Sequence, residues 1–111
     1  MNINKGKYGE AIACVFLQKQ GLVLLERNFR TRFGEIDLIM QDEKTIVFVE
    51  VKYRTSLDYG SPLESITLRK QNKIKKVASY YLSRFTHWPP CRFDVLGIID
   101  KEIIWVKGAF A

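Results

Sequence analysis

The sequence predicts an α/β protein in which helices flank a mixed central sheet, in the order α-β-β-β-α-β-β. The clearest observation is the segment Thr45–Tyr53, which is dense in β-branched and aromatic residues and is typical of a strand. The second is the segment Thr67–Phe85, whose apolar residues recur at the i, i+3, i+4, i+7 spacing of an amphipathic helix. Strand-like runs on both sides of such a helix indicate a mixed sheet covered by helices.

Local patterns place the other elements. Residues Lys5–Gln20 predict the first helix, because the segment holds good helix formers and Gly21 follows it. Asp42-Glu43-Lys44 predicts a tight polar turn, and Arg54–Ser65, which contains glycine and proline, predicts a loop. The remaining strands are predicted at Leu22–Arg30, Gly34–Gln41, Arg92–Ile99 and Glu102–Lys107.

Length and composition favour a single globular domain over residues 1–111, with 47% hydrophobic and 27% charged residues. The sequence holds neither the run of about 20 apolar residues of a membrane helix nor an apolar export signal. We therefore expect a cytoplasmic protein that does not associate with membranes. Cys14, Cys91 and the single His87 match neither a disulfide framework nor a zinc site.

The charge is basic and unevenly distributed. Eighteen Lys and Arg residues against twelve Asp and Glu residues give a net charge of +6. Residues 61–111 contribute +5 of this excess and residues 1–60 contribute +1. A concentrated basic excess indicates a polyanionic partner, although the sign alone does not separate DNA, RNA and an anionic membrane surface.

Three acidic residues stand in otherwise apolar patterns. Glu10 shares a helical stripe with Ala13, Cys14 and Leu17, either as a helix-start acid facing the helix dipole or as part of a site. Glu50 continues the apolar row of its strand, with Lys52 two residues further on the same face. The plain interpretation of that pair is a local ion pair at the strand end, but such residues are rarely placed in a core without a function.

Asp37 is the third acid, between apolar neighbours in the preceding strand. A three-residue turn pairs Gln41 with Thr45 and Asp37 with Val49, one position from Glu50. A bulge or a register step of one residue would place both carboxylates on one face. Two carboxylates and a lysine at a sheet edge are suited to Mg²⁺-assisted phosphodiester hydrolysis.

The start of the second helix is basic. Continuing its apolar stripe backwards places Lys70 and Gln71 on the core-facing side, directed at the edge of the sheet. Arg69 and Lys73 lie beside them. This basic start is either an ordinary solvated face or a set of phosphate contacts.

The motifs GEIDLI at 34–39 and FVEVKYR at 48–54 resemble the PD-(D/E)xK nuclease motif, with Ile36 in place of its proline. More broadly, the chain resembles the YraN family of small bacterial proteins. The further segments that carry this resemblance are Gly9-Glu10-Ala11, Arg27-Asn28-Phe29-Arg30, Tyr59-Gly60-Ser61-Pro62, Lys70-Gln71 and Arg92-Phe93-Asp94-Val95. The resemblance implies a restriction-endonuclease-like fold, similar to archaeal Holliday junction resolvases.

The resemblance also implies roles for the residues of the site. Asp37 and Glu50 would bind the metal, Mg²⁺ or alternatively Mn²⁺, with help from the Val51 carbonyl. Lys52 would act on the attacking water, Glu10 would support the metal site, and Gln71 would close it. The residues that we expect to bind nucleic acid are Arg30, Arg54, Arg69, Lys70 and Lys73. We interpret Asp94 as a structural partner of Arg92 or of another basic residue, in preference to a site residue.

The leading hypothesis is a metal-dependent DNA endonuclease acting on branched or structured DNA. A homodimer would suit such a substrate, and the Arg54–Ser65 loop would be long enough to reach a second copy. The first alternative is a non-catalytic nucleic-acid-binding module that retains the nuclease fold. The second is a protein-interaction factor whose basic charge serves only solubility.

Overall fold

The computed structural model describes residues 5–54 and 66–111. The observed order of elements confirms the predicted α-β-β-β-α-β-β arrangement and is that of a restriction-endonuclease-like core. The elements are α1 (Lys5–Lys19), β1 (Val23–Thr31), β2 (Gly34–Asp42), β3 (Thr45–Arg54), α2 (Leu68–Leu82), β4 (Cys91–Ile99) and β5 (Glu102–Phe110). Neither of these helices combines the length and apolar character needed to cross a membrane. The predicted loop at Arg54–Ser65, with its expected reach to a second copy, falls almost entirely on residues 55–65, outside the described residues.

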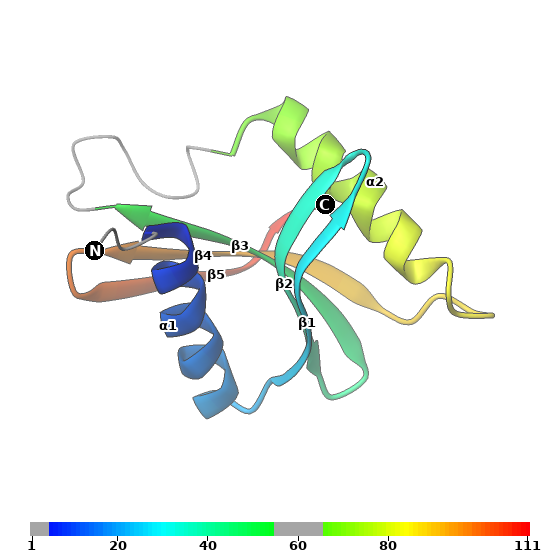
Figure 1. Cartoon of the computed structure of the whole chain (residues 1–111). Coiled ribbons are helices and arrows are strands. Elements are labelled where there is room, and N and C mark those ends of the chain that lie inside the picture. The colour runs from blue at the N-terminus through cyan, green and yellow to red at the C-terminus, as the bar shows by residue number, and fades with distance from the viewer. Residues whose placement is uncertain (1–4, 55–65) are drawn as a thin grey trace.

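The five strands form one sheet in the order β1-β2-β3-β4-β5. Neighbouring strands run antiparallel except β3 and β4, which are parallel, so the sheet is mixed as predicted. A parallel pair needs a long crossover, and α2 lies within the segment that connects β3 to β4. The two helices lie on opposite sides of the sheet (Figure 1).

The central strand β3 is apolar on both faces because each face is covered by a helix. Val47 and Val49 pack in the cluster that contains α1 residues, whereas Ile46 and Phe48 pack in the cluster that contains α2 residues. This alternation follows from the two-residue period of a strand. Glu50 lies on the same face of β3 as Phe48, two residues further along the strand. It therefore lies at the edge of the part of the core that packs against α2.

The predicted register between β2 and β3 is wrong by one residue. The structure pairs Asp42 with Thr45 and Leu38 with Val49, so the connection is a two-residue loop and not a three-residue turn. Glu43 takes a positive φ of 56°, which suits the turns that two-residue hairpins prefer. Continuing this register by one residue places Asp37 opposite Glu50 on the neighbouring strand. This is the one-residue shift that the two carboxylates need in order to lie on one face.

The ends of the second helix and of the last strand differ from the prediction by three residues, and the other ends differ by at most one. The second helix is shorter than the predicted Thr67–Phe85. At its start the hydroxyl of Thr67 accepts a hydrogen bond from the Lys70 N–H at 3.1 Å and caps the helix, and at its end the helix stops at Leu82 with Ser83 as its C-cap. The last strand continues three residues beyond Lys107, to Phe110. This extension depends on the Gly108 N–H, which donates to a buried carboxylate in β4.

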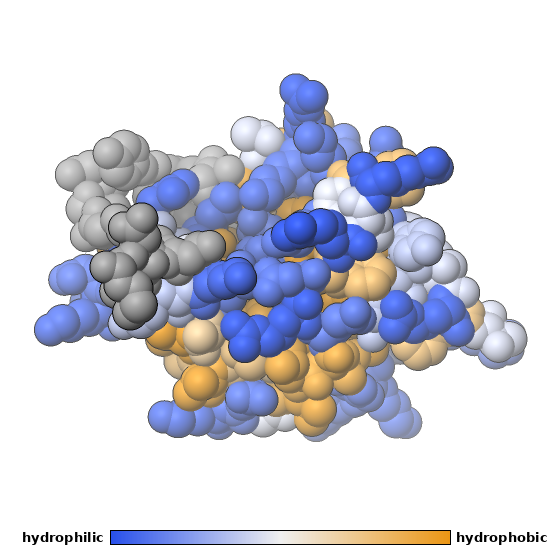
Figure 2. Space-filling view, in the orientation of Figure 1, coloured by the Kyte–Doolittle hydropathy of each residue, from blue (hydrophilic) through white to orange (hydrophobic). Residues whose placement is uncertain are grey.

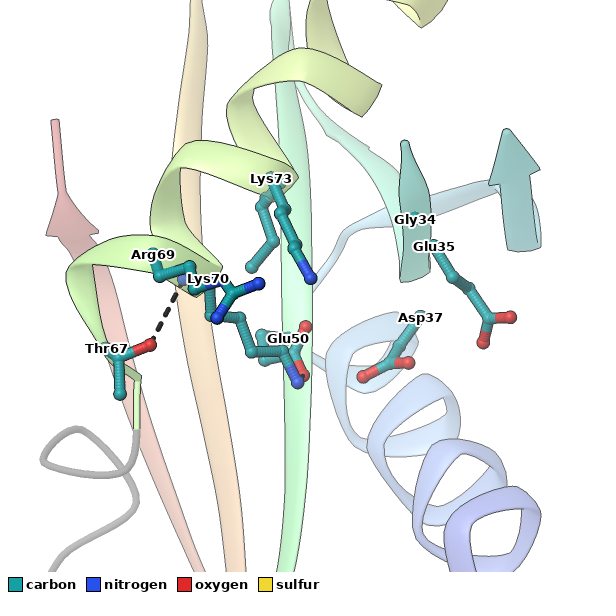
Figure 3. A pocket seen from close by; sticks show the side chains of 9 residues that line it. Gly34, Glu35, Asp37, Glu50, Thr67, Arg69, Lys70 and Lys73 are labelled. Atoms are coloured by element: carbon teal, nitrogen blue, oxygen red, sulfur yellow. Dashed lines mark hydrogen bonds and ion pairs between the residues drawn. The ribbon is translucent and has the colours of Figure 1, made fainter. Parts of the chain in front are cut away.

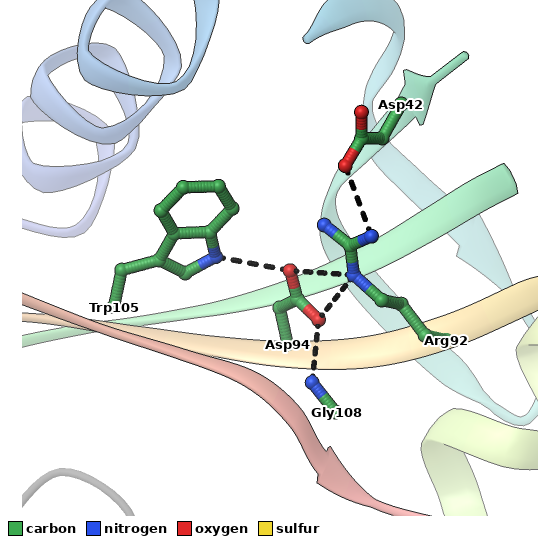
Figure 4. A network of polar contacts seen from close by, with 5 residues as sticks. All are labelled: Asp42, Arg92, Asp94, Trp105 and Gly108. Carbon is green, nitrogen blue, oxygen red and sulfur yellow. Dashed lines mark hydrogen bonds and ion pairs between the residues drawn. The ribbon is translucent and has the colours of Figure 1, made fainter. Parts of the chain in front are cut away.

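That carboxylate belongs to Asp94, which has no exposed side-chain surface. It accepts hydrogen bonds from Arg92 Nε at 3.1 Å, Trp105 Nε1 at 2.9 Å and Gly108 N at 2.9 Å (Figure 4). Arg92 also donates from Nη1 to Asp42 at 3.0 Å, which links β4 to β2. The predicted Arg92–Asp94 pair is thus confirmed, and it joins three strands of the sheet.

Candidate functional site

The candidate site lies where β2 and β3 separate, beside both helices. Glu10 comes from α1, Asp37 from β2, Glu50 and Lys52 from β3, and Lys70 from the start of α2. All five line one cavity of about 280 Å³. Asp37, Glu50 and Lys70 also line a larger cavity of about 600 Å³, in which their side chains point toward one another (Figure 3).

Asp37 fills the gap that opens between the two strands. Its Oδ2 accepts a hydrogen bond from the Val51 N–H at 2.8 Å, in place of the main-chain bond that a continued ladder would supply. Burial, followed by the negative charge of Glu50, raises the pKa of Asp37 to about 7, although the Val51 hydrogen bond opposes the shift. The site therefore disfavours the ionised carboxylate unless positive charge is added.

Glu50 is held by two lysines. Its Oε1 lies 2.8 Å from Lys70 Nζ and 3.8 Å from Lys52 Nζ, and its side chain is 7% exposed. Burial and the nearby Lys70 charge lower the pKa of Lys52. Burial is the largest single influence on Lys70 and disfavours its ammonium. The hydrogen bond to Glu50, the charge of Glu50 and smaller contributions from Lys52 and Asp37 together outweigh it and raise the pKa of Lys70. The expected Glu50–Lys52 ion pair is present, yet Lys70 is the closer partner.

Glu10, Glu35 and Asp37 form a cluster of three carboxylates whose ligand atoms lie within 4.8 Å of one another. Glu10 Oε1 is buried and, within residues 5–54 and 66–111, has no hydrogen-bond partner. Burial raises the pKa of Glu10, while a hydrogen bond from the Asn28 side chain opposes the shift. A buried oxygen without a donor is costly, so this cluster is suited to a divalent cation, which prefers oxygen ligands.

The helix-dipole interpretation of Glu10 does not hold. The first turn of α1 contains no acidic residue, so Glu10 lies beyond the reach of the dipole at the helix start. Its side chain is instead buried against the sheet, one turn before the apolar residues Ala13, Cys14 and Leu17. Its position in the apolar stripe is therefore explained by the carboxylate cluster.

The other residues predicted for the site divide into three groups. Arg69 and Lys73 line the larger cavity, and Val51 and Arg54 line the smaller one. Gln71 lines neither; its side-chain amide donates to the Ile66 carbonyl at 3.2 Å. Arg30 lies outside both cavities, with Nη2 2.6 Å from Glu35 Oε2. The roles assigned to all these residues remain predictions.

Two residues of this region were not singled out from the sequence for a site. Glu35 precedes Asp37 by two positions, so the strand period already placed both on one face. Asn28 lies between the pairs Arg27–Leu38 and Phe29–Ile36, across from Asp37, with a φ of 53°. Asn tolerates this left-handed conformation better than most residues, but its contact with Glu10 leaves no trace in the local pattern.

The comparisons with known proteins agree on one family. Residues 9–98 match the profile of "Uncharacterised protein family UPF0102". A UPF0102 protein of Janthinobacterium sp. (strain Marseille) is 51% identical over 104 residues, covering 94% of this chain and 85% of that protein. A UPF0102 protein of Nitrosomonas eutropha is 51% identical over 108 residues, covering 96% and 93%, and one of Thermodesulfovibrio yellowstonii is 47% identical over 108 residues, covering 97% and 96%.

Proposed function

The chain belongs to the UPF0102 family, which is the YraN-like family predicted from its sequence, and we propose its function from the site itself. The description of this family names no activity. The proposal is a divalent-metal-dependent DNA endonuclease that hydrolyses phosphodiester bonds. The observation that carries it is the convergence of Glu10, Glu35 and Asp37 within 4.8 Å, beside a lysine-bearing strand and a basic helix start. Metal-assisted phosphodiester hydrolysis needs this combination of groups.

The residues divide the work by their positions. Asp37 would hold Mg²⁺ or Mn²⁺, together with Glu10 and Glu35 or with Glu50. A bound divalent cation supplies Lewis-acid polarisation of the phosphoryl group and acidifies water. Lys52, in the same cavity as Asp37, would orient the attacking water and offset the negative charge that develops on the phosphate. Lys70 neutralises Glu50 in the absence of substrate.

The start of α2 supports DNA as the substrate. Arg69, Lys70 and Lys73 line the same cavity as Asp37 and Glu50. Neither Arg69 nor Lys73 forms an ion pair with any of the described residues. Both cations are therefore available to phosphates, which are bound mainly through Lys and Arg without reading sequence.

The test is cleavage of supercoiled plasmid and of a four-way DNA junction with Mg²⁺ or Mn²⁺. We expect the wild-type protein to nick DNA and Asp37→Asn to lose at least roughly 100-fold in rate, as when a single stabilising group is removed from an active site. Asp42→Asn is the matched control, because it makes the same change in the same strand outside the cavities. Mn²⁺ should also raise the melting temperature of the wild type and not of Asp37→Asn.

The alternative function is a nucleic-acid-binding module without catalysis. The 2.8 Å contact between Lys70 and Glu50 favours it, because an ammonium already neutralises one of the predicted metal ligands. The two functions differ in one result. If the wild type nicks no DNA with either cation, and Asp37→Asn and Glu50→Gln bind DNA as well as wild type, the module replaces the enzyme.

A further inference from the structure

A further cavity lies outside the candidate site, where the tip of the β1–β2 hairpin meets α2. It has a volume of about 380 Å³ and is lined by Arg30, Thr31, Arg32, Phe33 and Tyr80. The hairpin lies beside α2 in Figure 1, and the ring contact between Phe29 and Tyr80 confirms that they pack together. In the space-filling view, hydrophilic residues dominate this part of the visible face (Figure 2).

Two aromatic rings in this cavity are exposed. Phe33 is 38% exposed at the hairpin tip, and Tyr80 is 60% exposed on α2. The Tyr80 ring packs against the Phe29 ring, with ring centroids 6.3 Å apart. Aromatic rings with free surface in a basic groove are the groups on which proteins stack the bases of single strands.

Cations surround the Phe33 ring. The guanidinium carbon of Arg32 lies 4.9 Å from the ring centroid, and Lys76 Nζ lies 5.9 Å from it. Among the described residues no carboxylate pairs with Arg32 or Lys76. The cavity therefore offers a π surface and a guanidinium plane, both of which stack on bases, next to unneutralised positive charge for phosphates.

The residues of this cavity neighbour those of the candidate site along both elements. Phe33 directly precedes Gly34 and Glu35, which line the larger cavity. On α2, Lys73, Lys76 and Tyr80 recur at three- and four-residue spacing and share one face. Lys73 to Tyr80 spans roughly 10 Å at about 1.5 Å per residue, and about 3.4 Å of duplex axis separates successive nucleotides of one strand. A strand with a phosphate at the candidate site would thus place a nucleotide about three steps away in this cavity.

We propose that the hairpin–helix cavity binds one unpaired nucleotide of a DNA substrate, with the base stacked on Phe33 and the flanking phosphates held by Arg32 and Lys76. The proposal rests on the proposed function, since it names the kind of DNA that the endonuclease would select. Stacking does not discriminate between the four bases, because every base has a π face. The selected feature is therefore the unpaired state and not a sequence.

The experiment compares two DNAs in the presence of a chelator, so that binding is measured without cleavage. One is a fully paired duplex, and the other is the same duplex with a single unpaired 2-aminopurine nucleotide. We expect the wild type to bind the second DNA more tightly and to quench its 2-aminopurine fluorescence. Phe33→Ala should weaken that binding roughly 5- to 150-fold, the range for loss of one base–aromatic contact, and change binding to the paired duplex less than about twofold.

The control is Trp88→Ala, because Trp88 is likewise an exposed aromatic side chain, 60% exposed against 38% for Phe33, but lies outside the cavity. It should leave both affinities unchanged. Phe33→Leu keeps an apolar side chain at the hairpin tip and removes the π face, so it should behave as Phe33→Ala does even if the alanine variant folds poorly.

Equal wild-type affinity for the two DNAs, or equal weakening of both by the Phe33 variants, would overturn this assignment of the cavity. The endonuclease proposal fails separately, through the absence of cleavage with Mg²⁺ and Mn²⁺. A protein that prefers the unpaired nucleotide through Phe33 but cuts no DNA would keep the cavity assignment and lose the enzyme.

Discussion

Two carboxylate sites of this protein, one at Asp94 and one around Glu10 and Asp37, differ in how well their oxygens are satisfied by hydrogen-bond donors. Asp94, in β4, accepts hydrogen bonds on both oxygens from Arg92, Trp105 and Gly108. At the separation of β2 and β3, by contrast, Glu10 has a buried oxygen that receives no hydrogen bond from the residues the structure describes, and the pKa of Asp37 is raised to about 7. Among the described residues, every oxygen of the first site has a donor, and only the excess donor Arg92 Nη2 has no partner. The second site leaves one Glu10 oxygen without a donor, although cations already contact Glu35 and Glu50.

This difference assigns different roles to residues of the same type. A buried network whose acceptors are all satisfied fixes the geometry of the strands that it joins. A cluster of acceptors that the chain leaves unsatisfied costs stability, and it persists in active sites because a ligand completes it. Buried carboxylates by themselves therefore indicate neither role, and the donors around them decide.

The largest effect on stability should come from breaking the satisfied group. Asp94→Asn removes the fully buried charge that faces the Arg92 guanidinium and leaves Asp42 as the remaining acidic partner of that cation. We expect the free energy of unfolding to fall by about 3–5 kcal/mol, the usual cost of breaking a buried ion pair from one side. Urea denaturation measures this free energy. The control is Asp42→Asn, which removes the other and more exposed acidic partner of Arg92, and it should cost about 1 kcal/mol or less. Equal losses in the two variants would remove the distinction.

A smaller effect should appear when the unsatisfied group is titrated. The pKa of Asp37 is about 7 in the folded protein against an ordinary 3.8, so the native state binds this proton more tightly than the unfolded state. Raising the pH through that window should therefore destabilise the metal-free wild type relative to Asp37→Asn. We expect a relative loss on the order of 2 kcal/mol, because about 1.4 kcal/mol accompanies each pKa unit and solvent screening reduces the full amount.

Thermal unfolding of both proteins in chelator at several pH values measures this difference. The opposite slope, with the wild type gaining stability over Asp37→Asn as the pH rises, would show that Asp37 is already satisfied as Asp94 is. Added Mn²⁺ should reduce or reverse the loss, because a cation favours the ionised carboxylates.

The smallest effect should follow from a change at the rim of the cluster. Arg30→Ala removes the 2.6 Å contact with Glu35, but the Arg30 side chain is 76% exposed. Exposed ion pairs contribute at most about 1 kcal/mol, so the free energy of unfolding should change by less than that. A loss comparable to that of Asp94→Asn in the same urea titration would show that the rim of the cluster is as tightly integrated as the Asp94 network.

Much of this architecture is recorded locally in the sequence. The helical stripe of α2, the apolar density of β3 and the glycine after α1 each predict their element, because residue spacing and side-chain shape act within a few positions. The acids Glu10, Asp37 and Glu50 were also recognisable, because a charge in an apolar row stands out against its neighbours. Asp94 and Arg92, two positions apart on one strand, were predictable as a pair for the same reason.

What tertiary structure decided is which of these groups meet. One residue of loop length at Glu43-Lys44 set whether Asp37 stands level with Glu50, and the local pattern allowed either register. Lys70 is the closer partner of Glu50, and Gln71 turns away to Ile66, because the position of α2 over the sheet selects which long side chain reaches. Sequence periodicity fixes the face on which a side chain lies, whereas the distance between side chains from different elements depends on how those elements pack.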